Sequence, residues 1–373
     1  MITKAEIINF RGINALTIEG FSRLNIFVGR NGVGKTSIME AIAIGATGGR
    51  PQFFDYLARV RGLPGFSEEN PIGLEVYFGR AEAPLKITLC DENRCFITDA
   101  ERSNIADSRN STTTTKQATA DDKSMEILPT FLPLPSLVFS EVSNLYKFSY
   151  SHPGSNGPTT HTRNLHLRPG GHEVHPDDSC TICPKGFYLK GGMANLAGAN
   201  QLVDKLVRAG KREELVTMMR DVVPGVQDIT PSAQSGAPLV KTGDAVVPAQ
   251  VMGGGFVWLL TVYSQILLGN GTSSVAVIDE IETGLHHLSM PAMWENLNTL
   301  LRQMPQLQIF CSTHSEELLE KTLDVFREPQ NRDLLGIFRV MKEPGCSLEV
   351  RKADYDTLET IHELGEGRTH VTG

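Results

Sequence analysis

The stretch that decides the fold is GRNGVGKT at positions 29–36. It satisfies the pattern G-x-x-x-x-G-K-[ST], in which glycines let the main chain curl until its N–H groups point at phosphate oxygens. An apolar run at 24–28 predicts a strand before it. The residues at 36–44 predict a helix after it, whose N-terminus favours anions. A glycine turn that fits by chance is the alternative, but chance matches rarely have both flanks.

The chemical roles in this phosphate loop (residues 29–36) follow from residue type. Lys35 is expected to reach the β- and γ-phosphates of a nucleotide, and the Thr36 hydroxyl to bind Mg²⁺. Main-chain N–H groups and the first turn of the helix complete the predicted cradle. The other predicted nucleotide contacts in this loop are Asn31, Gly32 and Gly34, and Ser37 directly after it is also predicted to contact nucleotide.

Two carboxylates end an apolar run at 275–280, VAVIDE. Buried strands rarely finish in acids unless those acids face a cleft at the carboxyl end of a sheet. Asp279 is therefore expected to hold the Mg²⁺ shell, and Glu280 to orient and polarise the attacking water. A Glu280 that only caps the next turn is the alternative.

A histidine follows the next apolar run. His314 comes after the run at 307–311, where a histidine can hydrogen-bond a γ-phosphate, although a lone histidine after a strand is often structural. Lys35 and Asp279 are 244 residues apart, so a large segment must be inserted between adjacent parts of the sheet.

The rest of the chain predicts an α/β protein with an antiparallel β layer. Alternating runs at 2–10, 13–18, 72–78, 85–89 and 94–97 predict that layer. From 251 onward, short apolar runs between helical segments predict a parallel sheet covered on both faces.

The middle of the chain differs from both of these parts. Residues 101–126 predict a loop because they hold little apolar surface, and 132–139 predict a strand. Residues 150–192 are rich in Gly, Pro and His and predict an irregular insertion. Residues 199–223 predict two helices with a break at Gly210.

Amino-acid composition excludes some classes of function. The net charge of −8 over 373 residues argues against a broad nucleic-acid surface. The sequence shows no signal-peptide pattern and no membrane segment. Six cysteines do not suggest a disulfide scaffold, so a cytoplasmic protein is expected, with no role for Cys90 and Cys95.

Four zinc-type ligands lie close together in the predicted insertion. Two histidines and two cysteines fall within twelve residues, with two residues between the members of each pair, as suits tetrahedral N/S coordination. A structural Zn²⁺ clip and a chance cluster in a His-rich loop both stay open. The residues are His172, His175, Cys180 and Cys183.

Several segments together resemble the ABC-type ATPase heads of the SMC/RecF class, and most closely the stand-alone ATPases related to OLD nucleases of anti-phage defence. The similar segments are IINFRG (7–12), GRNGVGKTS (29–37), the helical arm at 199–229, IDEIETGLHH (278–287) and STHSEELL (312–319). The resemblance covers roughly 1–100 and 195–373. It implies a P-loop NTPase fold, specifically an ABC-type ATPase head with an antiparallel β subdomain and an inserted helical arm.

The resemblance also implies roles for particular residues. Glu280 would be the catalytic base, His314 the γ-phosphate sensor, and Arg11 a nucleotide contact, unless Arg11 is a plain strand-end arginine. The family's signature loop precedes a helix, and its place here is held by residues 251–255. Gly253 and Gly255 are therefore predicted to meet the γ-phosphate of a second subunit. Val251 stands where the family has a serine, and a plain glycine turn is the alternative.

These observations predict four regions: an N-terminal lobe (1–100), an insertion (101–198), the arm (199–230) and a C-terminal lobe (231–373). The resemblance implies an ATP- and Mg²⁺-dependent ATPase, slow and regulatory, that forms a homodimer or a higher oligomer. It is expected to control a separate effector, a nuclease, because the chain after His314 has no room for the Toprim domain of OLD nucleases. A RecF-like DNA-repair protein that binds DNA is the second hypothesis, and an ABC transporter cassette is the weakest.

Overall fold

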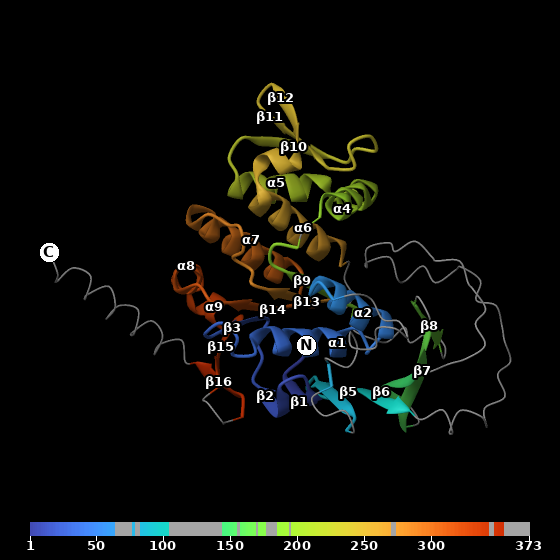
Figure 1. Cartoon of the computed structure of the whole chain (residues 1–373). Helices are drawn as coiled ribbons and strands as arrows, with labels where there is room; N and C mark the ends of the chain where they lie inside the picture. The colour runs from blue at the N-terminus through green and yellow to red at the C-terminus, as the bar shows by residue number, and fades with distance from the viewer. Residues whose placement is uncertain are drawn as a thin grey trace.

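The computed structural model describes residues 1–63, 77–78, 83–103, 144–154, 157–168, 171–176, 185–193, 195–269, 274–342 and 347–353. In this part of the chain, two large sheets lie on either side of one helix, and further helices cover the outer face of the central sheet (Figure 1).

The central sheet has six strands in the order β16-β15-β3-β14-β13-β9. Its pairs β15–β3, β3–β14, β14–β13 and β13–β9 are all parallel, and only β16 runs antiparallel, against β15. The bounds are β3 Leu24–Val28, β9 Lys185–Lys190, β13 Ser274–Asp279, β14 Leu307–Thr313, β15 Leu335–Met341 and β16 Glu349–Ala353.

Alternation along the central strands divides the interior into two cores. Ile26 and Ile278 pack on one face of the sheet, whereas Phe27 and Val277 pack on the other. Every residue of β13 and β14 is buried, as strands covered on both faces require. The predicted parallel sheet with two covered faces is confirmed.

The phosphate-loop helix α1 (Lys35–Ala46) lies between the central sheet and a seven-stranded antiparallel sheet. It contacts β13, β9 and β14 on one side and β4, β1 and β5 on the other. Helix α2 (Pro51–Val60) follows it. The seven strands are β1 Lys4–Phe10, β2 Ile13–Glu19, β4 Leu85–Cys90, β5 Cys95–Ser103, β6 Asn144–Gly154, β7 Gly157–Arg168 and β8 Gly171–Pro176.

Helices on the outer face of the central sheet build the second core. Helix α6 (Gly254–Leu268) contacts α4 and α5 of the arm, and α7 contacts α5, α8 and β14. A three-stranded sheet, β10-β11-β12, lies at the far end of this lobe (Figure 1). The remaining bounds are α4 Leu196–Arg208, α5 Arg212–Val222, β10 Val226–Thr230, β11 Leu239–Thr242, β12 Ala245–Pro248, η2 Ala249–Met252, η3 His287–Ser289, α7 Met290–Gln303, α8 Glu316–Val325 and α9 Pro329–Arg332.

The prediction of an irregular insertion at 150–192 is wrong. Strands β6, β7 and β8 extend the antiparallel layer, and β9 joins the nucleotide-binding sheet as an edge strand. Glycines in this segment mark strand ends and turns, as Gly154 opposite Gly157 does, and do not disrupt the strands. Strand β5 also crosses the boundary expected at residue 101. The sequence reading assigned no elements to α2 and the β10–β12 sheet.

The two cysteines for which the sequence predicted no role are bonded to each other. Cys90 and Cys95 lie opposite each other at the ends of β4 and β5 and form a disulfide. Their Cα atoms are 4.0 Å apart, because a hairpin turn separates them by only five positions.

Three predictions fall largely or wholly outside the described residues: the strand at 72–78, the loop at 101–126 and the strand at 132–139. Of the first, Tyr77 and Phe78 are described, and Phe78 bridges Phe10. None of the helices that the structure describes combines the length and apolar character needed to cross a bilayer.

Edge strand β9 packs on α1 through a residue without a side chain. A Cβ at Gly186 would lie 2.9 Å from the Ala46 Cβ and 3.2 Å from its carbonyl oxygen. We expect Gly186→Val to lower the free energy of unfolding by about 1–3 kcal/mol through overpacking, measured by urea titration. Gly12→Ala is the control, because its Cβ would meet only the Lys342 Nζ, at 3.9 Å. Equal stability of the two variants would refute tight packing at Gly186.

Candidate functional site

The phosphate loop connects β3 to α1 at the carboxyl edge of the central sheet. Gly34 caps the helix at φ 119°, a value that side chains strongly disfavour. A Cβ at Gly29 would lie 2.5 Å from the Val340 carbonyl oxygen, so only glycine fits against β15 there. The glycines predicted from the pattern are therefore required by packing and by main-chain conformation.

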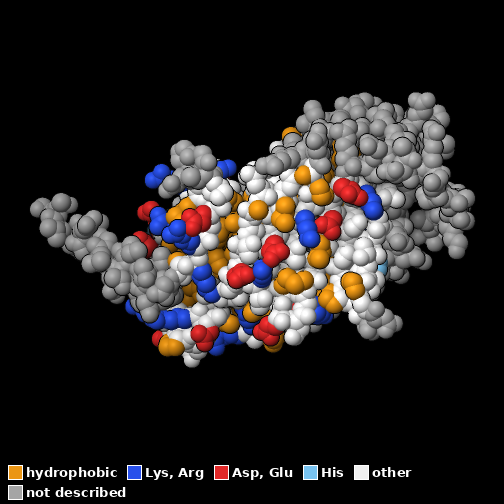
Figure 2. All heavy atoms as spheres, turned by 90° about the horizontal axis from the view of Figure 1, so that it is seen from below, with side chains coloured by type: hydrophobic (Ala, Val, Ile, Leu, Met, Phe, Trp, Pro, Cys, Tyr) orange, Lys and Arg blue, Asp and Glu red, His pale blue; other side chains and the backbone are white. Residues whose placement is uncertain are grey.

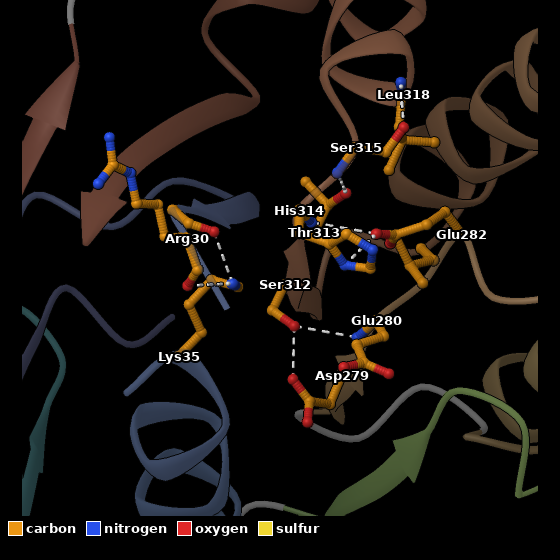
Figure 3. Close-up of polar contacts among 12 residues, drawn as sticks. Arg30, Lys35, Asp279, Glu280, Glu282, Ser312, Thr313, His314, Ser315 and Leu318 are labelled. Atoms are coloured by element: carbon orange, nitrogen blue, oxygen red, sulfur yellow. Dashed lines mark hydrogen bonds and ion pairs between the residues drawn. The ribbon is translucent and has the colours of Figure 1, made fainter. Parts of the chain in front are cut away.

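Lys35 begins α1 and points back into the loop. Its Nζ donates to the carbonyl oxygens of Gly29 at 2.7 Å and Arg30 at 3.1 Å (Figure 3). Burial lowers the pKa of the Lys35 ammonium, and the nearby carboxylates of Asp279, Glu282 and Glu280 oppose that shift. The structure thus brings the predicted lysine within electrostatic reach of the predicted acids.

One hydroxyl group organises the two predicted acids. Ser312, near the end of β14, donates from Oγ to Asp279 Oδ1 at 2.5 Å and accepts the main-chain N–H of Glu280 at 2.9 Å (Figure 3). Asp279 is fully buried. Because β13 and β14 are parallel neighbours, their ends place Ser312 beside both acids.

Glu280 has a left-handed main-chain conformation, with φ 56°. This region costs a non-glycine residue about 1–3 kcal/mol and persists where the surroundings hold it. The hydrogen bond to Ser312 holds it at the N–H, and Gly191 approaches its carbonyl oxygen so closely that a Cβ there would lie at 2.5 Å. The half-buried Glu280 is thereby turned away from the line of the strand.

Tyr188 of β9 supplies a second donor to Asp279, with its hydroxyl 3.3 Å from Oδ2. Burial first, and the Asp279 charge second, raise the pKa of Tyr188, so its hydroxyl stays a neutral donor. The segment that the sequence predicts as irregular therefore contributes directly to the site.

The charges of this edge fit a divalent cation. Three carboxylates, those of Asp279, Glu280 and Glu282, lie within electrostatic reach of one ammonium, Lys35. The hydrogen bonds of Asp279 described above come from neutral hydroxyls. Such an excess of carboxylate oxygens is the ligand chemistry that Mg²⁺ prefers. Asp279 and Thr36, which follows Lys35 in α1, are the residues that would hold it.

His314 follows β14 directly and lies beside an acid that the sequence reading did not single out. Its Nδ1 and its main-chain N–H are each 3.1 Å from Glu282 Oε1 (Figure 3). The imidazole is 46% exposed, while Glu282 is 9% exposed. The imidazole of the predicted sensor is thus exposed at the site, while the carboxylate that it contacts is buried.

The predicted signature glycines lie at the start of α6. Gly253 is the N-cap, with φ 98°, and is exposed. Gly255 packs so tightly on the turn after β13 that a Cβ would lie 2.1 Å from the Gly284 carbonyl oxygen. An exposed helix N-terminus is suited to an anion. Their role toward a second subunit stays a prediction.

The predicted nucleotide contact Arg11 is engaged in an ion pair. Its guanidinium lies 2.7 Å from Glu40 Oε2, and Arg61 lies 2.6 Å from Glu40 Oε1. Glu40 is fully buried on α1, one helical turn after Thr36. The ion pair anchors Arg11 to the phosphate-loop helix, and its contact with nucleotide stays a prediction.

The zinc hypothesis falls mostly outside the described residues. His172 and His175 belong to β8, with side chains that are not described, and Cys180 and Cys183 lie beyond it. Within the ranges that the structure describes, no group of three or more His, Cys, Asp or Glu residues is arranged to hold a metal.

Sequence reasoning missed four contributors: Ser312, Tyr188, Glu282 and Glu40. Ser312 directly precedes Thr313-His314 in the sequence, and Glu282 follows Asp279-Glu280 by two residues. This proximity to recognised motifs was the available signal. Tyr188 had no such signal, because its strand lies in the insertion. For Glu40 there was a signal, because it lies four residues after Thr36 in the predicted helix and therefore on the same face.

Removal of the Ser312 hydroxyl tests this arrangement. We expect Ser312→Ala to weaken Mg²⁺ binding to the nucleotide-loaded protein about 10- to 100-fold, the range for residues that orient a metal ligand. Ser312→Thr keeps a hydroxyl and should recover most of that affinity. The measurement is a Mg²⁺ titration monitored by a fluorescent nucleotide. Unchanged affinity in a folded Ser312→Ala protein would contradict the assignment.

Two protein families and one characterised protein match parts of this sequence. A family described as "AAA domain" matches residues 4–148, and one described as "AAA domain, putative AbiEii toxin, Type IV TA system" matches residues 196–320. A protein of Helicobacter pylori (strain ATCC 700392 / 26695), named ATP/GTP phosphatase, is 24% identical over 357 residues, covering 88% of this chain and 89% of that protein.

Two solved SMC heads also match. The SMC head domain from Thermotoga maritima is 12% identical with a TM-score of 0.40, covering 95% of this chain and 99% of that one. An SmcHead bound to the C-winged helix domain of ScpA is 12% identical with a TM-score of 0.50, covering 96% and 99%. With the phosphate loop, the acidic strand end and the antiparallel layer in place, the chain has the α/β P-loop NTPase fold with an ABC-type head, and two of its segments match AAA domain families.

Proposed function

We propose that this protein binds ATP with Mg²⁺ and hydrolyses it to ADP and phosphate. The observation that carries the proposal is the convergence of Lys35, Asp279, Glu280 and His314 at the carboxyl ends of three neighbouring parallel strands. This is where open α/β sheets bind ligands. The H. pylori relative named ATP/GTP phosphatase supports nucleotide hydrolysis, and adenine over guanine rests on the family resemblance.

Each residue has a distinct part in the proposed reaction. The phosphate-loop N–H groups and Lys35 would hold the β- and γ-phosphates, and the ammonium would exchange its Gly29 and Arg30 carbonyl partners for phosphate oxygens. Asp279 and Thr36 would hold Mg²⁺, which neutralises phosphate charge when bound. Glu280 would accept a proton from the attacking water, and His314 would donate a hydrogen bond to the γ-phosphate.

Glu280→Gln separates binding from chemistry. The amide keeps the shape of the side chain but accepts a proton poorly, so we expect ATP binding within about twofold of wild type and hydrolysis slowed about 100-fold or more. Fluorescent-nucleotide binding and phosphate release measure the two. Glu295→Gln on α7 is the control for loss of a carboxylate outside the site. Normal hydrolysis by Glu280→Gln would refute the assignment of the base.

We further propose that two copies close face to face around two nucleotides. The signature loop (residues 251–255) ends in an exposed helix N-terminus, and its Val251 side chain is 66% exposed. Leu288, four residues after the Gly284 on which Gly255 packs, is 75% exposed. A second copy would cover both features and bring the N–H groups of α6 to the γ-phosphate of its partner. The Glu280→Gln protein with ATP should accumulate as this pair, since hydrolysis no longer opens it; light scattering reports its mass.

The cellular role that we propose is control of a separate effector, a nuclease, in anti-phage defence. The family description that names a toxin and a Type IV TA system supports a defence setting. The matched SmcHead is bound to a domain of another protein, which supports docking of a partner on such a head. ATP closure would then present or release the surface that the effector reads, with slow hydrolysis as a timer.

The alternative is a RecF-like, ATP-dependent DNA-binding protein, which the SMC-head fold keeps open. Acidic and basic side chains are interspersed on the face shown in Figure 2, and the net charge is −8. Retention on duplex DNA between about 50 and 200 mM salt distinguishes the two, because phosphate contacts weaken about 10³- to 10⁵-fold over that range. Tight, steeply salt-dependent, ATP-dependent retention would favour the DNA-binding alternative.

A further inference from the structure

Glu282 is a buried acid with an unusual set of contacts. It lies in the turn after β13, and its Oε1 accepts the main-chain N–H of His314 at 3.1 Å and lies 3.1 Å from the imidazole Nδ1 (Figure 3). One oxygen therefore holds both the main chain and the side chain of the predicted γ-phosphate sensor.

This geometry determines which ring nitrogen is free. A carboxylate oxygen is a hydrogen-bond acceptor, so its 3.1 Å contact with Nδ1 favours the tautomer in which Nδ1 carries the proton. The same contact makes Nε2 the ring nitrogen left for another ligand. A histidine that met no carboxylate would be free to rotate its ring and to exchange tautomers, and it would lose this preset orientation.

The second oxygen of Glu282 shows that the contact is not simply a stabilising ion pair. Within the described part of the chain, Oε2 is buried and has no hydrogen-bond partner. Burying a carboxylate oxygen without a partner destabilises a fold. Glu282 also lies within electrostatic reach of the Lys35 ammonium. A buried acid that destabilises the fold and lies beside the phosphate loop is typical of a functional site.

We propose that Glu282 is a positioning residue that sets the orientation and protonated nitrogen of His314, so that Nε2 faces the γ-phosphate. The inference rests on the proposed ATPase function and deepens it, since it concerns how the site recognises the third phosphate. Glu282 itself contacts neither the phosphate nor the water in this mechanism. Its influence reaches the nucleotide only through His314.

A double-mutant cycle tests whether Glu282 acts through His314. We expect Glu282→Ala to lower kcat about 10- to 100-fold, as loss of an orienting partner does, with ADP affinity within about twofold of wild type. Combining it with His314→Ala should slow hydrolysis no further than His314→Ala alone. Glu282→Gln keeps an oxygen acceptor and should recover most of the activity. Multiplying effects in the double variant would overturn the proposal, as would a Glu282→Ala protein with normal kcat.

Glu317→Ala is the matched control. Glu317 is exposed in the first turn of α8, three residues after His314, so its removal deletes the same charge from the same region. It should leave kcat within about twofold of wild type. If Glu317→Ala slows hydrolysis as much as Glu282→Ala, loss of local negative charge explains the effect and the proposal fails.

Two further measurements do not depend on hydrolysis. With ¹⁵N-histidine labelling, the resonances that disappear in His314→Ala identify its ring, and the nucleotide-free wild-type protein should show a protonated Nδ1. Glu282→Ala should lose that signature, and its retention would overturn the proposal. Thermal denaturation should show Glu282→Gln close to wild type in stability, because the amide keeps an oxygen that accepts the His314 N–H groups, whereas a large loss of stability would show a merely structural role.

These outcomes separate the inference from the function on which it rests. A wild-type protein that does not hydrolyse ATP would remove the proposed function, while the NMR experiment would still report on the contact between Glu282 and His314. A wild-type protein that hydrolyses ATP and is slowed by His314→Ala but not by Glu282→Ala would keep the function and remove this inference alone.

Discussion

Parallel pairing of β3, β14 and β13 is the constraint on which the site depends. The register sets Thr313 opposite Val28 and Ile278 opposite Cys311, so three strand ends distant in sequence meet at one edge. Hydrogen bonds between strands fix this register, and a slip of one residue would turn every side chain to the other face. Because both faces are buried in separate cores, such a slip would move each side chain from the core that it fits into the other core and disrupt the packing of both.

A second consequence of this packing is that two charged groups of the site are buried away from water. Asp279 is fully buried, and Lys35 is 7% exposed. In such surroundings each charge needs a specific partner, because water cannot supply one. Ser312 meets that need with one hydroxyl that both donates and accepts. Tyr188 adds a donor from a strand that reaches the sheet only after the chain has built most of the antiparallel layer.

The resulting site has both fixed and adjustable groups. Hydrogen bonds to Ser312 hold the Asp279 carboxylate and the Glu280 main chain, whereas Lys35 is held by carbonyl oxygens that phosphate oxygens can replace. The imidazole ring of His314 is exposed, and the Glu282 carboxylate that it contacts is buried.

The sequence by itself determined the local chemistry: the phosphate loop, the two acids, the histidine and the parallel sheet that carries them. Spacing and residue type suffice there because each motif folds within one turn or one strand end. Only the tertiary structure decided that β9 joins the sheet, that Tyr188 and Ser312 meet Asp279, that Glu282 holds His314 and that Arg11 pairs with Glu40. Those contacts join residues far apart in the chain. Polar strands among glycines and histidines also have no apolar pattern from which a strand could be predicted. The physical reason is that side-chain partners depend on register and on packing across layers, which no short segment encodes alone.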